Sequence, residues 1–163
     1  MKIRAFTSAD YPRVQAIYQQ GIEGGHATFE TKIKTWEAWD KASAKSARLV
    51  VTTQDEVVAW ACLSDVSNRC VYEGVGETSL YIDNAFQGQG IGLKLLNALV
   101  EASEQAGYWT LQARIFPENI GSIIIHEKAG FEKFGIQKRL GKLQGQWRDV
   151  QLMERRSLIV GMD

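Results

Sequence analysis

The feature that most constrains the fold is a glycine-rich turn between a strand and a helix. Residues 78–99 read TSLYIDNAFQGQGIGLKLLNAL, in which a strand-like run passes through QGQGIG into a helical pattern. Gly107 ends that helix. Its apolar stripe consists of Ile91, Leu95, Leu96 and Leu99. A strand–turn–helix unit in mid-chain favours an α/β core.

The turn at residues 87–92 is suited to bind a phosphate group. Backbone N–H groups at a helix start point outward, the helix dipole is positive there, and glycines let an anion approach the backbone. Such a site needs neither an arginine nor a metal ion. The alternative is that these glycines only permit a tight strand-to-helix turn.

Two other phosphate loops do not fit. A Walker A loop needs Lys and then Ser or Thr directly after its last glycine, but Leu93-Lys94 follow Gly92. A dinucleotide fingerprint reads GxGxxG after the first strand. Here the glycines are spaced GxGxG, well into the chain. The sequence therefore disfavours both nucleotide folds.

The remaining patterns predict one α/β (α+β) domain over residues 1–163, with a tail at the end. Thr7 and Asp10 form a capping-box pattern, and Gly24-Gly25 ends the first helix. Asp55-Glu56 suggests a tight turn. The other predicted helices cover 35–45, 90–107 and 120–128, and the predicted strands cover 2–6, 48–53, 57–66, 77–83, 108–116, 131–140 and 147–156.

Composition narrows the function classes. There are 19 basic and 19 acidic residues, so the formal net charge is zero and a nucleic-acid partner is not expected. Cys62 and Cys70 have no CxxC spacing, which predicts reduced, buried thiols. With two histidines, no metal-site spacing occurs. Without a leader or a long apolar run, we expect a cytoplasmic protein with no membrane partner.

Two motifs resemble the GNAT acetyltransferases. Gln87-x-x-Gly90-x-Gly92 matches their Q/R-x-x-G-x-G/A signature, and a run from Asn119 to Phe131 matches the segment that follows it. The likeness extends over nearly the whole chain to the phosphinothricin and methionine sulfoximine N-acetyltransferases. The further matching positions are Ile3, Arg4, Asp10, Tyr18, Thr28, Phe29, Glu30, Tyr72, Glu77, Ser79, Tyr81, Gly145, Trp147 and Asp149.

The resemblance implies a mixed sheet of about seven strands, splayed between the fourth and fifth and flanked by about four helices. It implies acetyl-CoA as co-substrate, lying in the opening, and no metal. It also implies a homodimer, in which Trp147 is a candidate contact. The residues expected to bind acetyl-CoA are Leu80, Tyr81, Ile82, Gln87, Gly88, Gln89, Gly90, Ile91, Gly92, Leu93, Lys94, Asn119 and Ser122.

The same resemblance suggests two catalytic residues. An amine attacks a thioester only as its free base, and Glu77 stands at the position of the family's proposed base. It could instead be an ordinary carboxylate at the start of a strand. His126 could protonate the departing thiolate, or be a structural residue after the apolar run 123–125. A backbone N–H near residues 80–81 would stabilise the oxyanion.

The substrate is expected to be a small amine of the amino-acid type. Arg69 is the best-placed cation for its carboxylate. Relatives commonly carry arginine at Ser67, threonine at Val75 and lysine at Leu143, so a phosphinate substrate is less favoured here. A larger, less polar amino acid would fit if Gly74 and Gly76 leave room. The expected substrate-binding residues are Phe29, Glu30, Ser67, Arg69, Tyr72, Thr78 and Ser79.

Two alternatives stay open. The same fold could acetylate a protein N-terminus or a lysine side chain. It could also be a non-catalytic acyl-CoA-binding module that needs no base at Glu77. The tryptophans Trp36, Trp39, Trp60 and Trp109 are expected to serve packing.

Overall fold

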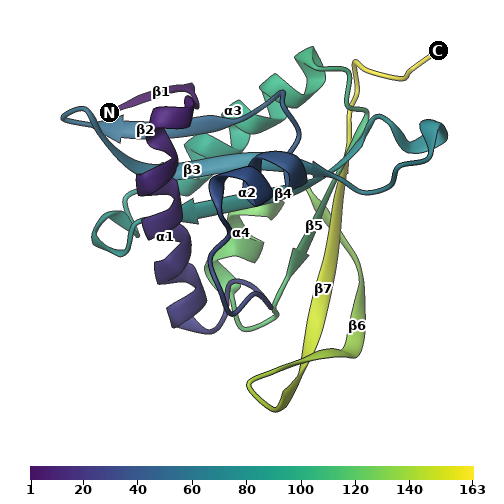
Figure 1. The fold of residues 1–163 in the computed structure, drawn as a ribbon. Helices are drawn as coiled ribbons and strands as arrows, with labels where there is room; N and C mark the ends of the chain where they lie inside the picture. The colour runs from purple at the N-terminus through teal and green to yellow at the C-terminus, as the bar shows by residue number, and fades with distance from the viewer.

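The computed structural model describes residues 1–163, which build one seven-stranded sheet of order β1-β2-β3-β4-β5-β7-β6 (Figure 1). The strands are β1 (Lys2–Ala5), β2 (Leu49–Thr53), β3 (Glu56–Asp65), β4 (Val75–Ile82), β5 (Thr110–Ile115), β6 (Glu132–Leu143) and β7 (Gln146–Arg156). The helices are α1 (Tyr11–Gly24), α2 (Trp36–Ala42), α3 (Ile91–Gln105) and α4 (Ile120–Lys128). Short 3-10 turns are η1 (Ser8–Asp10), η2 (Cys70–Tyr72) and η3 (Asn84–Phe86). No helix has both the length and the apolar character needed to cross a bilayer.

The sheet is split between its fourth and fifth strands, as predicted. All neighbouring strands are antiparallel except β4 and β5. This parallel pair is in register only over residues 75–77 and 110–112. Beyond Glu77 the two strands diverge, so the edge of β4 that faces β5 has no strand partner from Thr78 to Ile82.

Each face of the sheet carries its own apolar core. α1 and α2 cover the face in front in Figure 1, and α3 and α4 cover the face behind. The predicted stripe of α3 is almost wholly inaccessible and packs behind the sheet: Ile91, Leu95, Leu96 and Leu99. The front core is formed by Val14, Ile17 and Tyr18 of α1 with Trp39 and Trp60. The expected packing role of these two tryptophans is confirmed.

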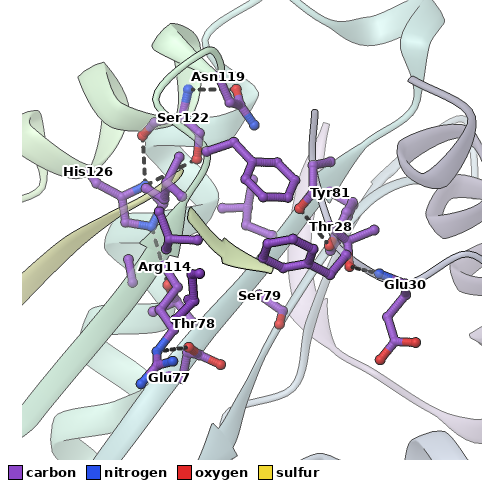
Figure 2. Close-up of a pocket in the computed structure, with 18 residues that line it drawn as sticks. Thr28, Glu30, Glu77, Thr78, Ser79, Tyr81, Arg114, Asn119, Ser122 and His126 are labelled. Atoms are coloured by element: carbon purple, nitrogen blue, oxygen red, sulfur yellow. Dashed lines mark hydrogen bonds and ion pairs between the residues drawn. The ribbon is translucent and has the colours of Figure 1, made fainter. Parts of the chain in front are cut away.

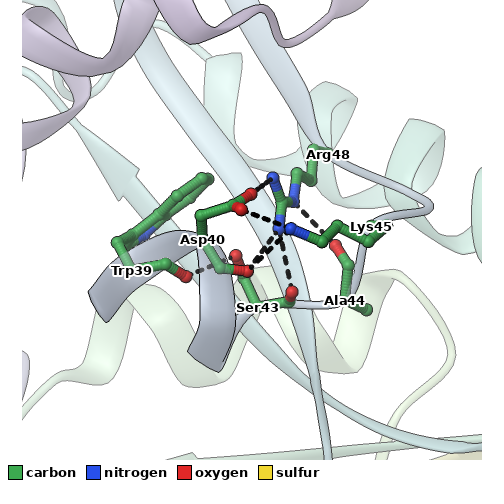
Figure 3. A network of polar contacts seen from close by, with 6 residues as sticks. All are labelled: Trp39, Asp40, Ser43, Ala44, Lys45 and Arg48. Atoms are coloured by element: carbon green, nitrogen blue, oxygen red, sulfur yellow. Dashed lines mark hydrogen bonds and ion pairs between the residues drawn. The ribbon is translucent and has the colours of Figure 1, made fainter. Parts of the chain in front are cut away.

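Arg48 holds the short helix α2 against the sheet (Figure 3). Its guanidinium donates to the carboxylate of Asp40 at 2.6 Å and to the backbone carbonyls of Asp40 and Ser43, both at 2.9 Å. It also lies 4.9 Å from the centre of the Trp39 ring. The last carbonyls of the helix thereby gain donors. The helix is shorter than predicted because the backbone at Ser43 is extended.

The prediction that Gly74 and Gly76 leave room for a larger substrate is wrong. A Cβ atom on Gly74 would lie 2.1 Å from the Trp109 ring, and one on Gly76 would lie 3.0 Å from the Tyr108 ring. Aromatic side chains that precede β5 therefore fill the space beside both glycines. These glycines allow close packing and do not enlarge the site.

The prediction of two buried thiols holds for one cysteine. Cys62 is buried in β3, whereas Cys70 is exposed in η2. Boundaries also differ at the last hairpin, where β6 extends to Leu143. Gln144 and Gly145 alone make the turn to β7, both with left-handed backbone angles.

Candidate active site

The split in the sheet opens into a cavity of about 290 Å³ between β4, β5, α4 and the loop after α1 (Figure 2). The structure brings ten of the predicted site residues together around it. They are Phe29, Glu30, Glu77, Thr78, Ser79, Leu80, Tyr81, Asn119, Ser122 and His126. Sequence reasoning missed other lining residues, above all Arg114 of β5, Phe116 directly after β5, and Leu140 of β6.

A second cavity, of about 380 Å³, lies under α1 and α2. Trp60, Cys62 and Ser64 of β3 pair with Tyr81, Ser79 and Glu77 of β4, and these side chains line its floor. Five residues border both cavities: Thr28, Glu30, Glu77, Ser79 and Tyr81. Glu77 therefore borders both spaces.

Glu77 is the last residue of β4 that pairs with β5. Its Oε1 lies 3.2 Å from Nε of Arg114, and its side chain is one-third exposed. Burial raises the pKa of the Glu77 carboxyl, and the positive charge of Arg114 partly opposes that shift. A carboxylate with a raised pKa is a better proton acceptor than a fully solvated one.

His126 is buried and bonded at both ring nitrogens. Nδ1 lies 2.7 Å from the carbonyl oxygen of Ser122 and must donate to it, because a carbonyl only accepts. Nε2 lies 3.2 Å from the hydroxyl of Thr78. Burial lowers the pKa of His126, and the bond to Ser122 partly opposes this. In the neutral ring, Nε2 carries no proton and accepts from Thr78, so the geometry favours a positioning role over proton donation.

Asn119 begins α4 as its capping residue. Its side-chain oxygen accepts from the Ser122 N–H at 3.3 Å. The cap uses only the oxygen of the amide, so the NH₂ group can still donate to a ligand in the first cavity. The cap thus orients Asn119 while leaving a donor free.

The glycine turn lies beside these cavities rather than in them. Gly88 and Gly90 have φ angles of +74° and +76°, which favour glycine, and a Cβ at either position would meet nothing within 4 Å. Gly90 caps the start of α3, where the first N–H groups have no intrahelical acceptor. The turn therefore needs its glycines for conformation and also presents open backbone. Gly92 differs, because a Cβ there would lie 3.0 Å from Ile125.

The structure leaves the other predicted residues outside both cavities. Arg69 is exposed and lies over the ring of Tyr72, 5.6 Å from its centre, and Ser67 stays in the same loop. In contrast, Lys34 lines the second cavity and was missed. The predicted cofactor residues that line neither cavity are Ile82, Gln87, Gly88, Gln89, Gly90, Ile91, Gly92, Leu93 and Lys94.

Arg148 ties β7 to the loops around the first cavity. It donates to the Gly25 carbonyl and to Nδ1 of His26, each at 2.9 Å, and pairs with Glu118 at 3.3 Å. Its guanidinium lies 4.1 Å from the centre of the Phe116 ring. No group of three His, Cys, Asp or Glu side chains is placed to hold a metal ion.

Comparisons with known proteins agree with this architecture. Residues 3–152 match the family model described as an acetyltransferase (GNAT) domain. The L-methionine sulfoximine/L-methionine sulfone acetyltransferase of Pseudomonas paraeruginosa is 30% identical over 158 residues, which cover 93% of this chain and 92% of that protein.

Two solved structures are close in shape. A phosphinothricin acetyltransferase of the GNAT superfamily from Sinorhizobium meliloti, in complex with AcCoA, has a TM-score of 0.90 and 27% identity, covering 99% of this chain and 91% of that one. The ribosomal-protein-alanine N-acetyltransferase from Brucella melitensis has a TM-score of 0.90 and 28% identity, covering 96% and 100%. The chain belongs to the GNAT family and is an acetyltransferase.

Proposed function

We propose that this protein transfers the acetyl group of acetyl-CoA to the α-amino group of a small amino acid or amino-acid analogue. The observation that carries the proposal is the position of Glu77 on the border of both cavities. The first cavity adjoins α4 and suits the acetyl end of the cofactor, and the second suits the amine. Relatives that acetylate methionine sulfoximine and phosphinothricin support this substrate class.

In this proposal, acetyl-CoA binds along the free edge of β4. Its pantetheine amides pair with the backbone of Leu80, Tyr81 and Ile82, where β4 has no strand partner. Its pyrophosphate binds the backbone of residues 87–94, and Asn119 donates to the cofactor arm. The open space at Gly88 and Gly90 supports the pyrophosphate position.

The transfer is a direct attack in a ternary complex. The ammonium group of the acceptor gives one proton to Glu77, directly or through one water, and the free amine nitrogen bonds to the thioester carbon. A backbone N–H near Leu80 and Tyr81 stabilises the oxyanion until the carbon–sulfur bond breaks. The nitrogen then loses its second proton and the departing thiolate takes up one proton, so the products are the N-acetyl compound and the thiol of coenzyme A. In this proposal His126 orients Thr78 beside this centre through the contact at its Nε2.

The base is tested with Glu77→Gln. Removing the proton acceptor should lower kcat about 100-fold or more while acetyl-CoA affinity stays unchanged. The assay measures thiol release with methionine sulfoximine, methionine sulfone, phosphinothricin, tryptophan and a short peptide. Glu73→Gln changes an exposed carboxylate of the neighbouring loop and is the matched control. Unchanged turnover in Glu77→Gln would exclude Glu77 as the base.

The cofactor site is tested with Gly90→Asp, which places a negative charge at the pyrophosphate position. We expect calorimetry to detect at least a tenfold loss of acetyl-CoA affinity. Gly107→Asp is the control, because Gly107 also has a left-handed φ, of +90°, and open space around it, at the other end of α3. Equal affinities in the two variants would refute a pyrophosphate site at this turn.

Acetylation of a protein N-terminus is the second candidate. The likeness to a ribosomal-protein-alanine acetyltransferase favours it. Turnover of an alanine-initiated peptide, with none of any free amino acid, would establish it instead. Tight acetyl-CoA binding without turnover of any amine would indicate a non-catalytic acyl-CoA-binding module.

A further inference from the structure

The second cavity is a chamber with aromatic walls. Trp60 stacks on Tyr81 with ring centres 4.9 Å apart, and the Tyr18 and Trp39 rings meet Trp60 edge-on, each at 5.9 Å. The Arg48 network fixes the end of α2 and with it Trp39 (Figure 3). Part of the chamber wall is therefore made of aromatic rings, against which a ligand's carbon skeleton can pack.

Lys34 supplies the one Lys or Arg side chain in the wall of this chamber. Its backbone carbonyl accepts from the Tyr11 hydroxyl at 2.6 Å and from Nε2 of Gln15 at 3.0 Å, which ties this loop to α1. Its ammonium lies 3.3 Å from Glu30 and 5.6 Å from the centre of the Tyr18 ring. Since an ammonium has three donors and Glu30 takes one, Lys34 can also bind a second carboxylate.

The charges around the chamber restrict what it can hold. Glu30 and Glu77 are both on its wall, so an anionic ligand needs Lys34 to offset them. A ligand with a second negative group, such as a phosphinate on its side chain, finds no second cation there. A cationic side chain would lose its hydration against the aromatic walls.

We infer that Lys34 binds the carboxylate of the acceptor amino acid and that the aromatic chamber binds a large, uncharged apolar side chain. This inference rests on the proposed function and names its substrate class. The sequence predicted that Arg69 would bind this carboxylate, but Arg69 lines neither cavity, and Lys34 has this role in the inference. The acceptor's amine then lies toward Glu77, on the border with the first cavity.

The test compares amino acids with amines that lack only the carboxylate. Wild-type kcat/KM is measured with L-phenylalanine and L-tryptophan and with phenethylamine and tryptamine. Lys34→Gln should lower kcat/KM for the two amino acids about 10- to 100-fold, since a hydrogen bond between charged groups is lost. Values for the two amines should stay within about twofold, because no carboxylate is present to contact position 34.

Two further variants separate charge from structure. Lys34→Arg keeps the cation and should retain most of the activity toward amino acids. Lys32→Gln removes an exposed lysine of the same segment and should leave both substrate classes unchanged. A mere disturbance of the loop by Lys34→Gln would lower both classes together.

Several outcomes would overturn the inference. An equal loss with amino acids and amines, or no loss with either, would show that Lys34 does not bind the carboxylate. Faster turnover of phosphinothricin or L-glutamate than of L-phenylalanine would contradict the apolar chamber. In both cases the proposed function still holds if the wild-type enzyme acetylates free amino acids. If the wild-type enzyme acetylates no free amino acid, both the proposed function and this inference are wrong.

Discussion

Glu77 is subject to two opposing effects on a single carboxyl group. Partial burial disfavours the charged form and raises its pKa, and the nearby Arg114 favours the charged form. The arginine is half-exposed, so its charge is screened by solvent but not removed. The balance decides over which pH range the carboxylate can accept a proton.

Arg114→Gln should therefore shift the pH dependence of kcat/KM. A base works in its unprotonated form, so activity falls as the pH drops through the pKa of Glu77. Loss of the positive charge raises that pKa, and the acidic limb should move upward by about one pH unit or less. The profile is measured with any amine that the enzyme acetylates. Arg139→Gln, an exposed arginine of β6, is the control, and an unmoved limb in Arg114→Gln would contradict this coupling.

At the scale of elements, the hairpin of β2 and β3 has an unusual turn. Thr53 pairs with Glu56, so Gln54 and Asp55 alone connect the strands. Both have left-handed φ angles, of 48° and 65°. Two-residue hairpins of this kind prefer Asn-Gly, because other residues pay a steric cost in the left-handed region.

Replacing Gln54 by Asn and Asp55 by Gly should stabilise the protein. The gain should be about 1 kcal/mol in the free energy of unfolding, since the left-handed geometry then fits the residues. Denaturant unfolding measures it. Valine at both positions should have the opposite effect, because a β-branched residue is poorly suited to positive φ. A fall in stability with Asn-Gly would show that the native side chains contribute contacts of their own.

Local signals predicted the helices and strands to within a few residues. The Thr7–Asp10 pattern is present as a hydrogen bond of 2.7 Å, and α4 was predicted with its observed bounds. The turn was placed one residue late, at 55–56, because Gln54 is not a typical turn residue and only Asp55 signals a turn. Features made by contacts between distant segments were missed, such as the Trp109 ring beside Gly74.

The candidate site shows the same difference between residues predicted from local signals and residues placed by contacts between distant segments. Motif positions such as Glu77 and Asn119 line the first cavity, as expected from where the strand and helix that carry them lie. Lys34 was missed because it sits in a loop without hydrophobic periodicity, where spacing predicts no direction for a side chain. The position of the Lys34 side chain depends on how α1, α2 and the sheet pack together in the folded protein.

At the scale of the whole molecule, the long β6–β7 hairpin projects from the body of the protein (Figure 1). It carries exposed apolar side chains, including Trp147 at 52% exposure. The others are Phe134, Ile136 and Leu140. Several exposed apolar side chains on one projecting hairpin are typical of an interface, and we propose that the hairpin joins two copies of the chain.

Trp147→Ser should therefore weaken dimerisation. Large aromatic residues contribute most to interface energy, so the dissociation constant of the dimer should be about tenfold or more higher in the variant than in the wild type. Light scattering after size-exclusion chromatography measures the mass. Leu158→Ser removes an apolar side chain of 77% exposure outside the hairpin and should leave assembly unchanged. A wild-type protein that stays monomeric at high concentration would refute the dimer.

The unpaired edge of β4 has a consequence for how long the protein survives in a cell. Without a ligand, the backbone groups of residues 78–82 that point away from β3 have no strand partner, and here the sheet can open or capture a foreign strand. A co-substrate that pairs with this edge completes the ladder and stabilises the fold in proportion to the logarithm of its concentration. A low concentration of the co-substrate would then reduce the amount of folded enzyme as well as the turnover rate of each molecule. The supply of co-substrate would therefore determine both the abundance of the enzyme and its rate.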